Sequence, residues 1–290
     1  MTASAPARSE SVLITGGTAG LGAEFARQLA GRGANLVLVA RNGPRLEDTA
    51  ARLRAGTGVR VETIAADLLE DDGVVRVLDR LADGASPVGT LINNAGHGLR
   101  AGFAESPLQE ELDLLRTHVT VPVALAHGAL QGMRRRGRGH IINIASMAGF
   151  TPRGSYSTAK AAMIHFSRWA NLQYGPEGVA VTAVCPGYTH TEFHQRMKMD
   201  TGRIPGWMWL DAEQVVREGL RDAAAGKAVS IPGLRYKALA VLARTLPPAL
   251  VAGMAARGRW PPAITGRFSP ASPGSGPSAA AHPARPRIPP

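Results

Sequence analysis

Short apolar runs alternate with longer helical patterns along this chain. Seven runs predict strands, at residues 12–15, 36–40, 61–65, 90–93, 140–145, 179–185 and 228–231. Most of them are continuously apolar rather than alternating, which is typical of strands that helices cover on both faces. Between them, apolar side chains recur at helical spacing, as in Leu21, Phe25 and Leu29. The repeated strand–helix order predicts an α/β fold, in which one domain holds a doubly wound parallel sheet.

The character of the sequence divides the chain into four parts. A polar N-terminus, residues 1–9, precedes the alternating region at 10–233. Residues 234–260 form an apolar and basic extension with two helical patterns, 234–245 and 249–256, which would cap a pocket, contact a second subunit or rest on a membrane surface; we favour plain packing. Residues 261–290 are rich in Pro and Ala with few large apolar side chains, and we expect them to be disordered.

Composition limits where the protein is expected to be located and which partners it is expected to bind. The single cysteine, Cys185, excludes an intramolecular disulfide, and no apolar run is long enough to span a bilayer, so we expect a cytoplasmic protein. The net charge of +11 suits either an anionic partner or arginine used as a general surface charge. The densest cluster, Arg134, Arg135 and Arg136, falls at an expected helix C-terminus, where the helix dipole favours cations. We therefore expect no nucleic-acid partner, and keep membrane contact through residues 234–256 as a weaker alternative.

A glycine-rich turn follows the first predicted strand. It reads Thr15-Gly16-Gly17-Thr18-Ala19-Gly20-Leu21-Gly22 and opens the first helix. Glycines let the backbone approach a pyrophosphate closely, and free N–H groups at a helix start attract phosphates. Its spacing differs from the commoner G-x-G-x-x-G fingerprint. At this place in the chain it predicts a nucleotide site that uses Gly16, Thr18, Gly20, Leu21 and Gly22.

The end of the second predicted strand bears on which dinucleotide would bind. Dinucleotide folds place an acid there for a ribose 2′-hydroxyl or an arginine for a 2′-phosphate. Here the strand ends in Arg41 and Asn42, with Arg45 one turn further and no acid. Because a guanidinium pairs with a phosphate through two hydrogen bonds, we expect NADP(H) to be preferred, with NAD(H) as the alternative.

Tyr156 and Lys160 are the strongest candidates for chemistry. Four residues apart on a helix, they lie on one face. A tyrosine alone is a poor acid or base at neutral pH because its reference pKa is about 10, and a nearby ammonium lowers that pKa. The pair therefore predicts proton exchange with a carbonyl/alcohol couple.

Together these motifs resemble the short-chain dehydrogenase/reductase family over roughly residues 11–233. The resemblance rests on the glycine turn, Asp67, Asn93-Asn94-Ala95-Gly96, Ser146, Tyr156 with Lys160, and Pro186-Gly187 followed by Thr191. It implies a Rossmann-type domain, an oxidoreductase that interconverts a ketone or aldehyde and an alcohol, and a homodimer or homotetramer.

The resemblance also implies residue roles. Tyr156 would exchange the proton on the substrate oxygen, Ser146 would orient that oxygen, and Lys160 would lower the Tyr156 pKa and hold the nicotinamide ribose. The cofactor-binding set that it implies comprises Asp67, Asn93, Ala95, Gly96, Pro186, Gly187, Thr189 and Thr191, besides the glycine turn and Arg41.

Two positions depart from the family pattern. His118 stands where many members carry a catalytic Asn; it would hold a relay water and show a pKa near 6.5 in the rate profile, or mark weakened activity. The interval from Ser146 to Tyr156 is also shorter than the resemblance implies, so we expect a more open substrate pocket. Both departures keep open the alternative of a non-catalytic NADP(H)-binding regulatory protein.

Residues 188–210 are expected to form a substrate lid. They hold many of the chain's few aromatic and Met side chains, which suits either closure over an apolar small molecule or packing of a helix pair. His190 and His194 have the spacing of a metal pair, but without an evident third ligand we predict no metal site.

Overall fold

The computed structural model confirms the predicted sheet. It describes residues 10–99, 101–192, 204–247, 249–251 and 253. Seven parallel strands lie in the order β3-β2-β1-β4-β5-β6-β7. Their bounds differ from the predicted ones by only a residue or two: β1 Ser11–Thr15, β2 Asn35–Ala40, β3 Val61–Ala65, β4 Val88–Asn93, β5 Gly139–Ile144, β6 Val179–Val184 and β7 Val229–Ser230.

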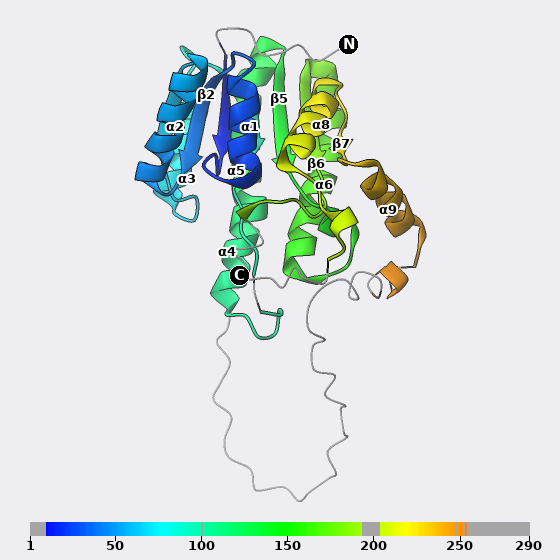
Figure 1. Cartoon of the computed structure of the whole chain (residues 1–290). Helices are drawn as coiled ribbons and strands as arrows, with labels where there is room; N and C mark the ends of the chain where they lie inside the picture. Colours follow the sequence, from blue (N-terminus) through cyan, green and yellow to red (C-terminus); the bar gives the residue numbers. More distant parts are fainter. Residues whose placement is uncertain (1–9, 100, 193–203, 248, 252, 254–290) are drawn as a thin grey trace, which may run out of the picture. The chain divides into compact units, whose positions relative to one another are not determined.

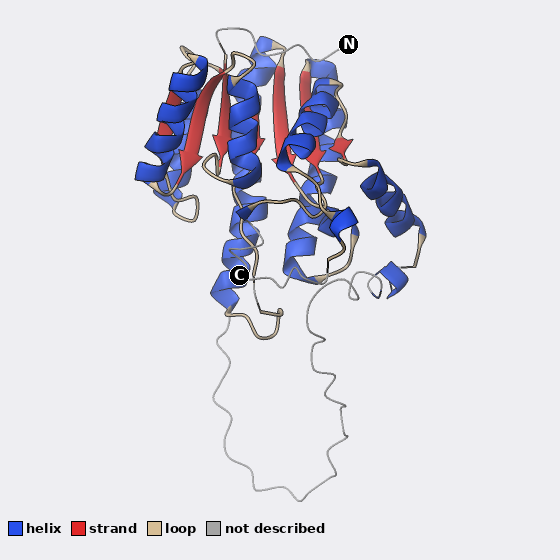
Figure 2. Ribbon diagram, in the orientation of Figure 1, coloured by secondary structure: helices blue, strands red, loops and turns tan. Residues whose placement is uncertain are grey.

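Helices cover both faces of the sheet (Figures 1 and 2). One face packs against α1 (Gly20–Ala30), α2 (Gly43–Thr57) and α8 (Ala212–Ala224), and the other against α3 (Asp71–Ala82), α5 (Val121–Arg136) and α6 (Gly154–Tyr174). Within β1, Val12 and Ile14 pack in the core on the α1, α2 and α8 side, and Leu13 packs in the core on the α3, α5 and α6 side. This two-sided burial explains why the strands are apolar at consecutive positions.

The order of the strands places a crevice at the centre of the sheet. β1 pairs with β2 on one side and with β4 on the other, so the crossovers leave in opposite directions at this point. The chain segments that follow β1 and β4 therefore diverge at their carboxyl ends, which is where open parallel sheets bind ligands. The glycine turn follows β1, and Asn94-Ala95-Gly96 follows β4.

A short π-helical turn, Arg116–Thr120, joins α4 (Leu108–Leu115) to α5. Pro122 in the first turn of α5 has no N–H to donate to the carbonyl of His118 four residues earlier. A π-turn is one way in which a helical path accommodates such a missing bond, and these turns occur often at functional sites. It holds His118 at the junction of the two helices, where the side chain is 3% exposed.

The predicted ends of the chain have mixed outcomes. The first helix of the extension is confirmed as α9 (Leu234–Thr245), whereas the second, predicted at 249–256, is described only at 249–251 and 253. The predictions for residues 1–9 and 261–290 lie outside the described residues. Arg134 pairs with Glu177, and Arg136 and Arg138 with Glu10, so much of the basic cluster is used within the chain. Within the described ranges, no helix is both long and apolar enough to cross a membrane.

Candidate active site

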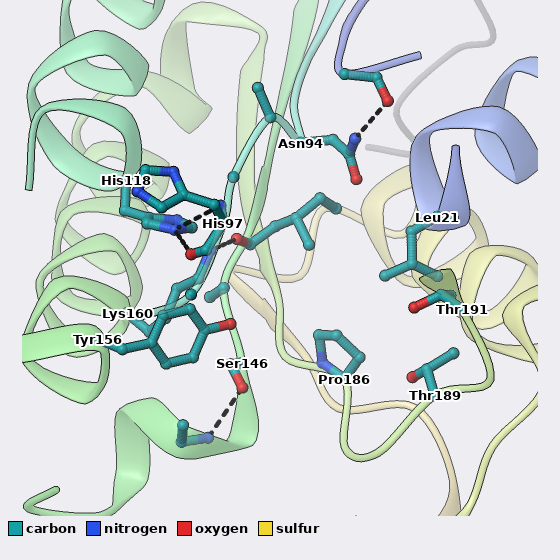
Figure 3. A pocket seen from close by; sticks show the side chains of 18 of the residues that line it. Leu21, Asn94, His97, His118, Ser146, Tyr156, Lys160, Pro186, Thr189 and Thr191 are labelled. Carbon is teal, nitrogen blue, oxygen red and sulfur yellow. Dashed lines mark hydrogen bonds between the residues drawn. The ribbon is translucent and has the colours of Figure 1, made fainter. Parts of the chain in front are cut away.

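A cavity of about 840 Å³ opens at the carboxyl ends of the strands. Its wall comes from the segments that follow β1, β2, β3, β4, β5 and β6, together with α6 and α9. Figure 3 shows side chains from both sides of the crevice around one space. Sixteen of the predicted site residues line it: Gly16, Thr18, Gly20, Leu21, Arg41, Asp67, Ala95, Gly96, His118, Ser146, Tyr156, Lys160, Pro186, Gly187, Thr189 and Thr191.

The glycine turn is shaped by close backbone contacts. Gly16 has a φ of 68° and Gly20 a φ of 52°, a region that other residues rarely adopt. Gly22 does not line the cavity; a Cβ there would lie 2.2 Å from the carbonyl oxygen of Gly16. Gly22 thus lets α1 start directly behind the turn. The first turn of α1 carries no acidic side chain, and its N–H groups are available to an anion.

Asn94 lines the cavity, where the sequence predicted its neighbour Asn93. Asn93 is 6% exposed and donates to the Pro122 carbonyl (3.1 Å) and to Asn143 Oδ1 (2.9 Å). It lies beneath the cavity and ties β4 to β5 and α5, so its predicted place in the cofactor wall is corrected. Asn94 lines the cavity instead and donates to the carbonyl oxygens of Thr15 and Gly16, which fixes the glycine turn.

Charged side chains line the end of the cavity that lies beside β2 and β3. Arg41 reaches out from the end of β2 with its side chain 72% exposed, and its nearest acid is Asp67, at 3.8 Å. Asp67 also accepts from the backbone N–H of Leu69 (3.0 Å). Arg45, in the first turn of α2, is held by Asn42, whose side chain accepts from the Arg45 N–H. Two arginines thus line this end of the cavity.

Tyr156 and Lys160 project from α6 into the cavity, opposite Ser146 (Figure 3). The Lys160 ammonium lies 5.6 Å from the centre of the Tyr156 ring and donates to the Ile144 carbonyl oxygen at 2.6 Å. Its burial lowers the Lys160 pKa to about 7. Ser146 Oγ accepts from the Ala148 N–H at 3.1 Å and so caps a short 3₁₀ turn. The hydroxyl keeps its own proton available for a substrate oxygen.

The His118 ring packs against the Tyr156 ring. The two rings meet edge-on, with the centres 5.4 Å apart. The His118 Nε2 lies 2.6 Å from the His97 carbonyl oxygen and 3.3 Å from the His97 nitrogen, so it donates to the carbonyl in one tautomer and accepts from the N–H in the other. A Cβ at Gly96 would lie 2.4 Å from the ring, so only glycine allows this packing.

Burial argues against the predicted titration of His118 near pH 6.5. Desolvation first, and then the nearby Lys160 ammonium, hold the pKa of His118 well below its usual value. The ring therefore stays neutral across the physiological range. Sequence reasoning missed His97, which also lines the cavity; its position directly after the Asn-Asn-Ala-Gly run was the available signal.

The substrate side of the cavity is partly described. Tyr188 and Met208 line it, and His190 stacks on Trp209 with ring centres 4.6 Å apart. Phe193, His194, Met197 and Met199, which the lid prediction included, lie outside the described residues. Among the residues that are described, no group of His, Cys, Asp and Glu is arranged to hold a metal ion.

α9 completes this side of the cavity. Tyr236 is 3% exposed; its hydroxyl donates to the Met208 carbonyl (2.6 Å) and accepts from the Tyr188 N–H (3.0 Å). Its ring fills the space beside Gly187, where a Cβ would lie 1.9 Å from it. Further along, apolar side chains from the extension line the cavity: Leu239, Leu242, Ala243, Leu246 and Val251.

The same helix covers the shortened loop. Arg244 stacks over the Phe150 ring at 4.8 Å, between α9 and the 3₁₀ turn Met147–Phe150. Of the roles that the sequence left open for the extension, packing and pocket lining both apply to α9, whose Tyr236 and Ala240 are buried and whose Leu239 lines the cavity; subunit and membrane contact stay predictions. α9 covers this side of the loop, and the expectation of a more open pocket stays a prediction.

Comparison with known proteins agrees with this geometry. Residues 10–202 match the family model for short chain dehydrogenases. A short-chain dehydrogenase from Sphingobium yanoikuyae, solved in complex with NADPH, is 35% identical, with a TM-score of 0.75 over 81% of this chain and 94% of its own. The bulky-bulky ketone specific alcohol dehydrogenase from Comamonas testosteroni is 34% identical, with a TM-score of 0.71 over 81% and 92%.

A curated relative extends the likeness along the chain. Dehydrogenase/reductase SDR family member 7B from Bos taurus is 30% identical over 257 residues, which cover 84% of this chain and 79% of the relative. The family match covers more than half of the sequence, and the motifs of the glycine turn, Ser146, Tyr156 and Lys160 meet in one cavity. The chain therefore belongs to the short-chain dehydrogenase/reductase family of NAD(P)-dependent oxidoreductases.

Proposed function

We propose that this enzyme interconverts a bulky, mainly apolar ketone or aldehyde and its alcohol with NADP(H). The observation that carries the proposal is the convergence of Ser146, Tyr156 and Lys160 on one cavity, which the glycine turn closes at its other side. The retained Ser, Tyr and Lys favour turnover over the alternative of a regulatory protein that binds the cofactor without reaction.

The three side chains divide the work of proton transfer. Ser146 donates a hydrogen bond from its hydroxyl to the substrate oxygen, which orients the carbonyl and stabilises the negative charge that develops there. Tyr156 gives that oxygen a proton during reduction and takes it back during oxidation. The ammonium form of Lys160, beside the ring, favours the phenolate and so lowers the energy of the proton transfer.

The cavity suits a dinucleotide cofactor. Gly16 and Gly20 hold backbone conformations that leave the turn open to a pyrophosphate, and the start of α1 faces it. When bound, the cofactor supplies the hydride, and the protein supplies orientation and electrostatics. Pro186, Gly187, Thr189 and Thr191 line the end nearer Ser146 and would hold the nicotinamide.

The preference for NADP(H) rests on Arg41 and Arg45 at the adenosine end. The Sphingobium relative binds NADPH, which supports it. Replacing Arg41 by Asp puts an acid where a 2′-hydroxyl would be read, and should shift the NADP/NAD ratio of kcat/KM toward NAD at least tenfold. An unchanged ratio would contradict this assignment.

The substrate class rests on the apolar wall that α9 and Met208 add to the cavity. The Comamonas relative acts on ketones with two bulky substituents, which supports a large substrate. We expect NADPH oxidation with aryl or long-chain ketones and at most slow turnover with acetone. A kcat/KM that is highest for the smallest ketone would contradict the proposed class.

The oligomeric state stays a prediction. Exposed apolar side chains on α4 and α6, among them Leu108, Leu112, Trp169 and Leu172, support a homodimer or homotetramer built on these helices. Light scattering of the purified protein would measure the mass directly. Membrane contact through 234–256 and the cytoplasmic location also stay predictions.

A further inference from the structure

A strap of chain crosses the cavity from the nicotinamide end to the adenosine end. Residues 189–192 form it, and three of these residues, Thr189, Thr191 and Glu192, line the cavity. Near the middle, Thr191 packs against the glycine turn, where a Cβ at Gly20 would lie 3.4 Å from the Thr191 Cβ. At its end, Glu192 Oε1 accepts from Arg45 Nη2 at 2.7 Å. This ion pair joins positions 147 residues apart.

Arg45 can pair either with Glu192 or with an anionic ligand in the cavity. The Asn42 cap fixes the backbone of the first turn of α2, so the side chain starts from a defined position at the end of β2. The side chains of Arg45 and Glu192 are 42% and 44% exposed, which leaves the pair open to exchange with a ligand. Among the described residues, the ion pair of Arg41 is a long contact with Asp67, at 3.8 Å.

A carboxylate and a phosphate compete for the same face of a guanidinium, because each offers two oxygens to its paired N–H groups. The Glu192 carboxylate accepts one hydrogen bond from Arg45, from Nη2 to Oε1, and so occupies part of this face. A 2′-phosphate that pairs with Arg45 through two hydrogen bonds would compete with it for Nη2, whereas a ribose without that phosphate need not disturb the pair.

We propose that Glu192 determines cofactor specificity by occupying Arg45 in the cofactor-free protein and competing with the 2′-phosphate of NADP(H). The inference rests on the proposed preference for NADP(H).

The test is the affinity of Glu192→Gln for three ligands, measured by isothermal titration calorimetry: NADPH, NADH and adenosine 2′,5′-bisphosphate, which lacks the nicotinamide. Since half-exposed ion pairs are weak, we expect about threefold tighter binding of NADPH and of the bisphosphate, with NADH unchanged. Glu213→Gln is the matched control: Glu213 is an exposed acid paired with Arg217 and lies off the cavity wall, so no affinity should change.

A second background separates competition from simple repulsion. In Arg45→Met, the gain from Glu192→Gln should disappear, because the side chain that both anions share is gone. An equal gain in that background would overturn the proposal, since Glu192 would then act directly on the phosphate. Unchanged affinities in Glu192→Gln, with thermal unfolding showing a folded protein, would also overturn it.

The same titrations separate this inference from the proposed function. A wild-type protein that binds NADH as tightly as NADPH contradicts the cofactor preference, and the inference with it. A wild-type protein that prefers NADPH, with no response to Glu192→Gln, keeps the proposed function and removes only the role of Glu192.

Discussion

The two walls of the cavity differ in how the chain builds them. The cofactor wall consists of short segments at the carboxyl ends of the strands, and hydrogen bonds such as those from Asn94 to the glycine turn fix it. The substrate wall is assembled from the 3₁₀ turn after Ser146, the segment at 204–210 and α9. Sheet topology dictates the first wall, whereas side-chain packing between distant segments makes the second.

This difference separates cofactor binding, which many dinucleotide enzymes share, from substrate binding, which is particular to each enzyme. The cofactor wall repeats what any nicotinamide dinucleotide demands, namely close backbone approach and cations for phosphates. The substrate wall does not have to fit one common ligand, and here the C-terminal extension supplies part of it. Tyr156 stands where the two walls meet, and Tyr236 ties the substrate wall to the turn at Gly187.

The largest expected effect comes from the residue at this junction. Tyr156→Phe removes the proton donor and keeps the ring, so kcat/KM should fall more than a hundredfold while the Kd for NADPH changes less than about twofold. Steady-state kinetics and calorimetry would measure the two quantities. Tyr174→Phe, on the same helix and off the cavity wall, is the control and should retain full activity. More than a tenth of the wild-type activity in Tyr156→Phe would argue against this role.

A second prediction tests whether the Lys160 ammonium is shielded from water. Burial lowers the Lys160 pKa from 10.5 to about 7, so the unfolded chain binds the proton more readily than the folded one. Below pH 7 the folded state bears the full cost of the buried charge, and between pH 7 and about 10 wild-type stability rises relative to a neutral variant. The stability advantage of Lys160→Met should therefore shrink with rising pH, by about 1.4 kcal/mol per pH unit in this window.

Urea unfolding of Lys160→Met and the wild type, from pH 6 to pH 10, would measure that slope. A difference in the free energy of unfolding that is independent of pH would show that Lys160 is hydrated, and that the cofactor wall is more open than the structure describes.

The smallest predicted effect concerns the substrate wall alone. Leu242 lines the cavity, and its neighbour Val241 points to solvent with 60% of its surface exposed. Leu242→Ala should raise KM for a bulky apolar ketone about fivefold, because roughly 1 kcal/mol of apolar contact is lost, and should leave NADPH binding unchanged. Val241→Ala should change neither. Equal effects of the two variants would mean that α9 acts on the fold rather than on the substrate.

The sequence predicted the sheet and the cofactor wall well. Strands buried on both faces are mostly apolar at consecutive positions, and the glycine turn is local in sequence, so both leave readable patterns. Asn93 shows the limit: two adjacent Asn side chains point to opposite sides of the strand end, and the pattern alone did not tell which one enters the cavity.

The substrate wall was harder to predict because it depends on long-range packing. The contacts of Tyr236 with Tyr188 and Met208 join segments 48 and 28 residues apart, and Arg244 covers Phe150 from another element. No local spacing encodes such contacts. The lowered pKa of His118 was missed for the same reason, since the burial that causes it depends in part on Gly96, which is far from His118 in sequence.

The most direct test of hydride transfer in this cavity follows an isotope. NADPH labelled with deuterium at nicotinamide C4, prepared separately on each face, would be mixed with the enzyme and a bulky ketone, and the alcohol analysed by mass spectrometry. We predict one deuterium at the carbinol carbon from one labelled face only, and formation of labelled alcohol by Tyr156→Phe that is more than a hundredfold slower. NADPH that binds tightly and yields no labelled alcohol from either face, across a broad panel of carbonyls, would contradict the account.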